Sequence, residues 1–323
     1  MATLIIGAGL VGSQIARILV EGGEQPVLMD AAPQPEALGE IVDLARVRLV
    51  EGDVLRPYAL MQAIREHAIT EIVHTAANPL LTMGAQRDPF AAIQLNIMGT
   101  VNVLEAARVM QLKRVVVSSS NVLSHYLAGG EGKGDLAREE ALPRPVTFYA
   151  TTKQAIENLG LNYARWCGVD FAAVRYGAVA GPWSGRGGGG PSNVFRSAIL
   201  NALRGQEAVV PAGAMEWVYV KDAAQGTALA LKAKDLKSRI FNVTMGGVTP
   251  PQAFAAAITA VLPGARVRIE TPAAAGASLM DMGHGSDLTL AREVLGYAPR
   301  FAITDAVRDM VEWFRANDRA GRA

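Results

Sequence analysis

The chain has 323 residues, of which half are hydrophobic and 19% are charged, which is typical of a folded globular protein and excludes a disordered one. The formal net charge is +1, so there is no basic excess that would attract nucleic acid. A single cysteine, Cys167, excludes an internal disulfide, and four scattered histidines lack the spacing of a zinc site, so we expect no metal.

Short apolar segments alternate with amphipathic segments of helical length along the first half of the chain. The predicted strands cover residues 3–6, 26–29, 47–51, 72–74, 114–118, 171–175 and 240–243. The predicted helices lie near residues 12–22, 57–68, 87–110 and 148–167. Several of these strands are apolar throughout, as strands buried on both faces are. The alternation therefore predicts an α/β fold with a doubly wound parallel sheet.

The pattern changes after residue 176. A flexible glycine-rich loop at 185–190 is followed by predicted helices near 192–204, 221–233 and 304–316. We interpret residues 1–176 as a cofactor domain, with a strand near 240–245 that returns to its sheet. Residues 177–239 and 246–323 are then predicted to form a smaller substrate domain.

Membrane and export signals are absent from this pattern. No apolar run reaches the roughly 18 residues that span a bilayer. The N-terminus enters an apolar segment directly, without the basic region and cleavage-site pattern of a signal peptide. We therefore expect a cytoplasmic protein with no membrane partner.

A glycine-rich turn follows the first predicted strand. Its glycines, Gly7, Gly9 and Gly12, open a helix whose N-terminal N–H groups can bind a pyrophosphate. Asp30 ends the second strand about 20 residues on, where an acid binds the adenosine ribose hydroxyls. No Arg or Lys follows Asp30 until Arg46, which favours NAD over NADP. Asp53, at the end of the third strand, either binds the adenine amine or caps the next helix.

Tyr149 and Lys153 lie one turn apart on the same face of a predicted helix. A free phenol has a pKa near 10, and the ammonium of Lys153 is expected to lower it. The phenolate could then take a hydroxyl proton while hydride leaves the adjoining carbon. The serine run 118–120 ends an earlier buried strand, and the carboxyl ends of parallel strands face the ligand crevice.

Taken in order, these motifs resemble those of the extended short-chain dehydrogenase/reductases, the NAD-dependent epimerase/dehydratase family. The similar segments are the glycine turn, residues 52–54, 74–77, 96–107 and 115–120, the Tyr149/Lys153 pair, and residues 175–182, 217–224 and 295–299. The resemblance covers nearly the whole chain. It implies a Rossmann-type sheet with a smaller C-terminal α/β substrate domain, NAD as cofactor, and a homodimer formed through the helices near 87–110 and 148–167.

The resemblance also implies roles for individual residues. Tyr149 is the expected general acid/base. Lys153 is expected to hold the nicotinamide ribose and to act as the electrostatic partner of Tyr149. Ser120 is expected to supply the active-site hydroxyl, with Ser119 and Ser124 as alternatives. The other expected cofactor-binding residues are Gly7, Gly9, Leu10, Val11, Gly12, Asp30, Asp53, Val54, Ala76, Ala77, Asn96, Ser118 and Tyr176. Candidate substrate contacts are Asn78, Ser120, His125, Arg186 and Asn193.

Several positions depart from the family pattern. Ile6 replaces the usual first glycine of the turn. Met215 stands where family members that act on nucleotide sugars carry an arginine for the diphosphate, and residues 277–290 offer no replacement. Losing one charge-assisted bond costs about 1.5–3 kcal/mol. The pair Asn121-Val122 replaces the acid/base pair that a dehydratase would need after the active-site serine.

The loop after residue 182 either closes over a small substrate, with Arg186 on its carboxylate, or forms a loose surface turn. We therefore expect an enzyme, an NAD-dependent oxidoreductase that oxidises a secondary alcohol of a sugar, sugar acid or hydroxy acid. The alternative is a sugar or nucleotide-sugar epimerase/dehydratase, which returns the hydride to its product. A non-catalytic NAD-sensing protein on the same fold is a third hypothesis, which the intact Ser120, Tyr149 and Lys153 disfavour.

Overall fold

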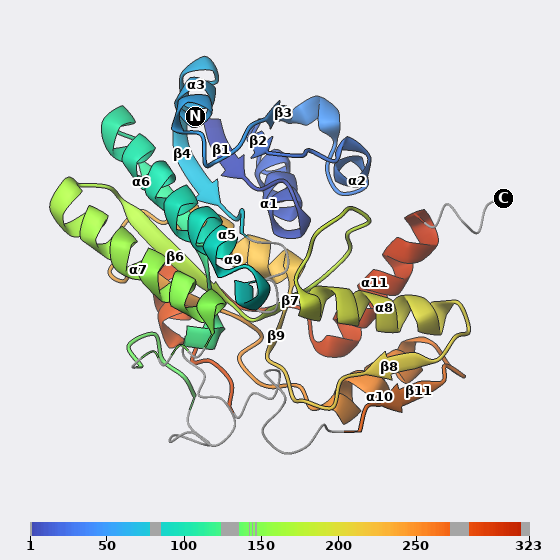
Figure 1. Ribbon diagram of the computed structural model, residues 1–323. Coiled ribbons are helices and arrows are strands. Elements are labelled where there is room, and N and C mark those ends of the chain that lie inside the picture. Colours follow the sequence, from blue (N-terminus) through green and yellow to red (C-terminus); the bar gives the residue numbers. More distant parts are fainter. Residues whose placement is uncertain are drawn as a thin grey trace.

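The structure is a computed structural model that describes residues 2–77, 85–123, 136–141, 143, 145, 147–271 and 284–317. Its centre is a seven-stranded parallel sheet in the order β10-β6-β5-β4-β1-β2-β3 (Figure 1). The strands are β1 (Ala2–Ile6), β2 (Val27–Asp30), β3 (Arg48–Glu51), β4 (Ile69–His74), β5 (Arg114–Ser120), β6 (Phe171–Tyr176) and β10 (Ile240–Val243). The predicted doubly wound fold is confirmed, and β10 returns to pair with β6.

Helices cover both faces of the sheet. One face carries α3 (Pro57–Glu66), α5 (Pro89–Ile93), the π-helical turn η2 (Gln94–Met98), α6 (Gly99–Met110) and α7 (Phe148–Cys167). The other carries α1 (Leu10–Glu21), α2 (Pro35–Gly39), α9 (Val220–Lys232) and the π-helical turn η4 (Ala291–Leu295). Short 3-10 turns, η1 (Leu44–Arg46) and η3 (Asn121–Leu123), follow α2 and β5. Successive strand residues therefore enter different cores, which explains why whole strands are apolar.

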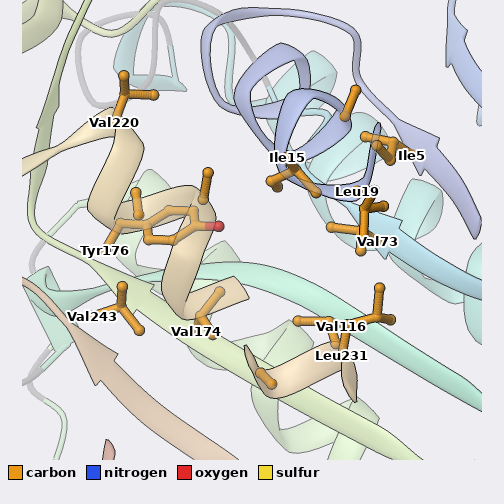
Figure 2. Packing of buried hydrophobic residues seen from close by; sticks show 14 of the residues in the cluster. Ile5, Ile15, Leu19, Val73, Val116, Val174, Tyr176, Val220, Leu231 and Val243 are labelled. Carbon is orange, nitrogen blue, oxygen red and sulfur yellow. The ribbon is translucent and has the colours of Figure 1, made fainter. Parts of the chain in front are cut away.

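The core under α1 and α9 shows this packing directly. Figure 2 shows side chains of the sheet, Ile5, Val73, Val116 and Val174, beside Ile15 and Leu19 of α1 and Leu231 of α9. All of these side chains have less than one-tenth of their surface exposed. On the opposite face, Ile72 and Val117 pack against α3, α6 and α7. The two cores hold the strand ends rigidly where the site lies.

The smaller C-terminal unit consists of α8 (Gly190–Leu203), β8 (Ala208–Val210), α10 (Pro251–Val261), β11 (Val267–Ile269) and α11 (Ile303–Asn317). Its core stacks Phe195 on Phe254, with ring centroids 4.5 Å apart, and Trp217 packs edge-on against Phe195 at 5.0 Å. The short strands β7 (Ala178–Ala180) and β9 (Trp217–Tyr219) pair with each other between this unit and the sheet. The sequence pattern predicted neither α10 nor any of these three-residue strands.

One helical stretch among the described residues, Pro89–Met110, is long and apolar enough to cross a membrane by length and composition alone. The expectation that no segment reaches this length is therefore wrong. The stretch consists of α5, η2 and α6. Within its most apolar segment of 18 residues, 44% is buried inside the protein. It packs on α7 and, through α6, on β4 and β5. Covering the sheet accounts for its buried apolar residues without a bilayer.

The strand order places a topological switch between β1 and β4. The chain leaves β1 toward β2 and β3, and then crosses back to β4 on the other side of β1. Ligands of such sheets bind in the crevice at the carboxyl ends of the strands beside this switch. The glycine turn after β1, residues 75–77 after β4 and the serines of β5 all end strands at this edge.

Candidate active site

The three glycines of the first turn serve different purposes. Gly7 has a φ of +99°, and a Cβ there would lie 2.6 Å from the amide nitrogen of Ala76. A Cβ on Gly12 would lie 1.9 Å from the carbonyl oxygen of Gly7, so helix and strand can pack this closely only with glycine. At Gly9, no heavy atom of the described residues lies within 4 Å of the Cβ position. That open position is where a phosphate can approach the backbone.

The N-terminus of α1 fits a pyrophosphate. Gly9 is its N-cap, and no side chain of the described residues caps its N–H groups. The first N–H groups of a helix have no partner within the helix and carry its positive dipole end. The replacement of the usual first glycine by Ile6 is tolerated, because Ile6 completes β1 and its carbonyl oxygen accepts from Thr75 and Ala76. These residues therefore fit the diphosphate of a dinucleotide.

Asp30 is held beside the glycine turn by two main-chain hydrogen bonds. Its Oδ2 accepts from the amide of Ala8 and its Oδ1 from the amide of Ala32, both at 2.9 Å. The carboxylate is thus fixed at the end of β2, where an adenosine ribose would lie. Asp53 binds locally, because its Oδ1 accepts from the amide of Leu55 at 2.8 Å. This bond closes a local turn before α3, whose N-cap is Arg56 without a side-chain hydrogen bond, so the capping interpretation of Asp53 is wrong and an adenine contact stays a prediction.

Other predicted cofactor residues already have partners within the protein, which limits the groups that they can offer to a cofactor. Tyr176 lies in the core with its hydroxyl bonded to Thr227, and Figure 2 shows it near Val174 and Val243. Only its main chain can then contact a cofactor. The amide of Ala76 bonds Ile6, so only its carbonyl is available, and Ala77 follows it in the same connection.

Four further cofactor candidates, Leu10, Val11, Val54 and Asn96, lie in or beside helices. Leu10 and Val11 form the first turn of α1, between Gly9 and Gly12. Val54 is buried, and a Cβ on Gly99 of α6 would lie 3.0 Å from it. Asn96, in the π-helical turn, is buried and donates from Nδ2 to Thr152 Oγ1 at 3.0 Å.

Tyr149 and Lys153 lie in the first two turns of α7, which begins where Thr147 Oγ1 accepts from the amide of Ala150 at 3.1 Å. Both side chains are buried. The hydroxyl of Ser120 is hydrogen-bonded to the phenol of Tyr149. Lys153 Nζ lies 5.6 Å from the centroid of the Tyr149 ring. Strand β5 and helix α7 thus bring the three predicted catalytic residues together.

The structure distinguishes between the alternative serines. Ser119 Oγ donates to Glu157 Oε1 at 2.5 Å and is occupied there. Ser120 is the one that bonds Tyr149, while Ser124 lies outside the described residues. Ser118 contributes its carbonyl oxygen, which accepts from Lys153 Nζ at 2.7 Å. The geometry therefore favours Ser120 as the active-site serine.

Burial dominates the protonation of the site. It raises the pKa of Tyr149 to about 12, and the hydrogen bond with Ser120 lowers this pKa only in part. Burial also lowers the pKa of Lys153 to about 8, against the opposing charge of Glu157. The predicted net lowering of the Tyr149 pKa is therefore wrong for this structure, because burial disfavours the charged phenolate and raises the pKa. Tyr149 is therefore a protonated phenol at neutral pH.

The glycine-rich loop before α8 is docked, and residues 183–186 do not form the loose turn considered above. Gln34 Oε1 accepts from the amide of Arg186 at 2.5 Å, and Gln34 Nε2 donates to the carbonyl of Arg186 at 3.1 Å. The buried indole of Trp183 donates to the same carbonyl at 3.1 Å. Figure 1 shows this loop reaching from β7 toward α2. No contact among the described residues joins Arg186 to Tyr149 or Ser120.

The remaining substrate candidates are less well placed or outside the described residues. Asn193 lies in the first turn of α8, where its Oδ1 accepts from Arg196 at 3.0 Å. Asn78 and His125 lie outside the described residues. Of the three candidates for substrate contact that the structure describes, only Ser120 is seen in contact with Tyr149.

A set of buried polar residues that the sequence pattern did not predict surrounds the end of β5. Glu157 and Arg175 form a bidentate ion pair with two contacts of 2.8 Å. Glu216, fully buried, accepts from Asn121 Nδ2 at 2.8 Å. A signal existed for the ion pair, because Glu157 lies one helical turn beyond Lys153 and Arg175 is a charge within an apolar strand. No local pattern marks the contact of Glu216, which joins distant segments.

His74 ends β4 and is 3% exposed, and neither of its ring nitrogens has a hydrogen-bond partner in the described part of the chain. Burial, and to a smaller extent the charge of Lys153, lowers its pKa from 6.5 to about 3. Between these two pH values the unfolded chain binds a proton that the folded protein excludes. Neutral His74 therefore stabilises the fold fully above pH 6.5, and this stabilisation is lost as pH falls toward 3.

We expect the free energy of unfolding to fall across this window by about 1.4 kcal/mol per pH unit more in the wild type than in His74→Leu, which cannot titrate. Urea denaturation of both proteins at several pH values measures the difference. The same pH dependence in both proteins would show that His74 is solvated or paired in solution.

The geometry of this site agrees with three comparisons with known proteins. A family model, the NAD dependent epimerase/dehydratase family, matches residues 3–244. An uncharacterised protein of Methanocaldococcus jannaschii is 28% identical over 261 residues, which cover 80% of this chain and 76% of that protein. The structure is similar to UDP-glucose 4-epimerase of Thermus thermophilus in complex with NAD, with a TM-score of 0.82, 25% identity, and coverage of 98% of this chain and 100% of that chain.

It is also similar to an L-threonine dehydrogenase from Cupriavidus necator, with a TM-score of 0.82, 25% identity, and coverage of 97% of this chain and 99% of that chain. The Thermus structure holds NAD, and the matching family is defined by its dependence on NAD. The chain therefore belongs to the NAD-dependent epimerase/dehydratase family, and it is an enzyme with NAD as its cofactor.

Proposed function

We propose that the enzyme oxidises a secondary alcohol of a small polar substrate, a sugar, sugar acid or hydroxy acid, with NAD as the hydride acceptor. Met215 carries this proposal. It occupies the position where nucleotide-sugar members have a diphosphate-binding arginine, and it is 3% exposed within the apolar core of the C-terminal unit. A thioether in that core offers no cation to a diphosphate, so a substrate without one is favoured.

The buried trio at the strand ends supplies the proton chemistry. Bound NAD would supply the acceptor for the hydride that leaves the carbinol carbon. The phenol of Tyr149 must first lose its own proton, because burial keeps it protonated at neutral pH. As a phenolate it would then take the hydroxyl proton while the hydroxyl of Ser120 orients the reacting oxygen, so that the alcohol becomes a ketone, the hydride passes to the cofactor and one proton is released overall. The ammonium of Lys153, 5.6 Å from the centroid of the Tyr149 ring, is a nearby cation that would favour this phenolate, against the larger opposing effect of burial. We also propose that Lys153 holds the nicotinamide ribose.

An epimerase acting on a sugar or nucleotide sugar is the second candidate. The similarity to UDP-glucose 4-epimerase favours it, because that enzyme shares the fold over the whole chain. The same residues would then return the hydride to the opposite face of the ketone. Dehydration is disfavoured, because Asn121 and Val122 offer no acid/base pair and the Asn121 amide is bonded to Glu216.

Absorbance at the NADH band tests the two candidates. Purified enzyme and NAD are mixed with sugars, sugar acids, L-threonine and other hydroxy acids, and nucleotide sugars. L-threonine is included because it is a small hydroxy acid and a structural relative is an L-threonine dehydrogenase. Net NADH with one small substrate supports the dehydrogenase. A flat trace with NAD retained by the purified protein, and an epimer detected by NMR, would replace it with the epimerase.

We also propose a homodimer in the cytoplasm, with the substrate bound by residues 177–239 and 246–323. Exposed large apolar side chains on the helices named for the interface support the dimer, since exposed apolar surface often marks a site of protein–protein contact. These are Phe90, Ile93, Met98 and Val109 on Pro89–Met110, and Phe148 and Trp166 on α7. The single cysteine supports a reducing compartment. Sedimentation equilibrium decides between one and two chains.

A further inference from the structure

Two buried carboxylates hold the residues on either side of Ser120. Ser119 Oγ donates to Glu157 Oε1 at 2.5 Å, on the α7 side. Asn121 Nδ2 donates to Glu216 Oε2 at 2.8 Å, on the β9 side. The active-site serine therefore lies between two anchored neighbours at the point where β5 becomes the turn η3.

The carboxylate of Glu216 collects hydrogen-bond donors from three other segments. Its Oε1 accepts from Thr244 Oγ1 and from the amide of Ser286, both at 2.7 Å. Its Oε2 accepts from Ser286 Oγ at 2.7 Å as well as from Asn121. The side chain has no exposed surface. The main chain of Glu216 is also held in place, because its carbonyl oxygen accepts a hydrogen bond from the amide of Ala178 at 2.8 Å.

Each of these four groups donates a hydrogen bond to the carboxylate. Position 216 therefore requires a side chain that accepts hydrogen bonds and donates none. The amide of Asn121 and the main-chain N–H of Ser286 cannot act as acceptors through their nitrogens. A glutamine at position 216 would turn its own NH₂ group toward one of these donors. A buried hydrogen-bond network that is fully satisfied is rigid, whereas one that is partly broken is costly and loose.

Ser120 has weak local support of its own. Its Oγ accepts from the amide of Val122 at 3.4 Å, at the long end of hydrogen-bond distances. The direction of its hydroxyl toward Tyr149 therefore depends on where the neighbouring backbone is held. Ser119 is held from α7, the helix that also carries Tyr149, and Asn121 is held from the opposite side of the site.

We propose that Glu216 is a positioning residue, which acts through Asn121 to aim the Ser120 hydroxyl at the reacting oxygen beside Tyr149. The proposal rests on the catalytic role of Ser120 within the proposed function. It couples the smaller unit to the chemistry, because the carboxylate of Glu216 links the start of β9 and Ser286 to the end of β5.

A double-mutant cycle tests this coupling. We compare the wild type, Glu216→Gln, Ser120→Ala and the double variant, with NAD and the substrate identified by the NADH assay. Ser120→Ala is expected to lower kcat on the order of 10²-fold or more, and Glu216→Gln on the order of 10²-fold through misplacement of the serine. In the Ser120→Ala background, Glu216→Gln should cost no further activity. Equal losses in both backgrounds would overturn the proposal.

Asp222→Asn is the matched control. Asp222 is also fully buried, and its carboxylate accepts from the amides of Arg300 and Phe301 at 3.0–3.1 Å, away from β5. We expect Asp222→Asn to lower Tm and leave kcat unchanged. If Glu216→Gln fails to fold, Asn121→Ala replaces it in the same cycle, since it removes the same link from the other end.

A structural measurement separates failure of this proposal from failure of the proposed function. Crystals of the wild type and of Glu216→Gln grown with NAD alone need no substrate. The proposal expects Ser120 Oγ to lose its hydrogen bond with Tyr149 in the variant. An unmoved Ser120 would overturn the positioning role, whichever substrate the enzyme uses.

Discussion

Replacing Tyr149 with phenylalanine is expected to lower kcat by roughly 10²- to 10⁴-fold, the usual contribution of a general acid/base. The change removes one oxygen from a buried ring and leaves its packing in place. It also removes the partner of Ser120, so the reacting oxygen loses its proton acceptor and part of its orientation. NADH formation with the identified substrate measures kcat, and the quenching of protein fluorescence by NAD measures whether cofactor binding survives.

Tyr163→Phe is the matched control for this variant. Tyr163 lies on the same helix, and its hydroxyl donates to Glu105 at 2.7 Å, away from the site. We expect this control to retain the wild-type kcat. Turnover by Tyr149→Phe at the wild-type rate would remove Tyr149 from the mechanism and, with it, the proposed function.

Glu157→Gln is expected to lower the free energy of unfolding by about 3–5 kcal/mol, the usual effect of breaking a buried ion pair from one side. The substitution leaves the guanidinium of Arg175 charged in a place where it is 2% exposed. It also removes the charge that supports the protonation of Lys153, and the anchor of Ser119. Urea denaturation followed by circular dichroism measures the loss.

An exposed ion pair provides the comparison. Asp305 and Arg308 pair at 2.7 Å on the surface of α11, with 47% and 53% of their side chains exposed. Asp305→Ala should cost only about 0–1 kcal/mol. Adding Arg175→Met to Glu157→Gln should recover part of the stability, because the unpaired charge is then gone. A small loss in Glu157→Gln and no recovery in the double variant would show that Arg175 finds another anion or water.

The cofactor half of the site followed from local sequence. A glycine turn, a helix N-terminus and an acid at the end of the next strand lie within one βαβ unit, so their spacing along the chain sets their spacing in space. Tyr149 and Lys153 are likewise one helical turn apart. Gly7, Gly12 and Asp30 lie in the structure as this local logic predicted.

The C-terminal unit followed less well from the sequence. Strands of three residues, such as those at 178–180 and 208–210, are too short to show an alternating pattern. Helix α10 is rich in alanine, which fits both a polar and an apolar face and hides its amphipathic pattern. The docked loop at 183–186 also escaped prediction, because its glycines suggest freedom while Gln34, far away in sequence, holds it.

The sequence by itself determined the doubly wound sheet, because strands covered on both faces must be apolar throughout, and it predicted the candidate residues for NAD binding and proton transfer. Only the tertiary structure decided which serine bonds Tyr149, because Ser119 and Ser120 are chemically equivalent until α7 brings Glu157 to the first. The tertiary structure also decided that the pKa of Tyr149 is shifted upward. Desolvation depends on everything packed around a phenol, which no spacing between two residues in a chain can report.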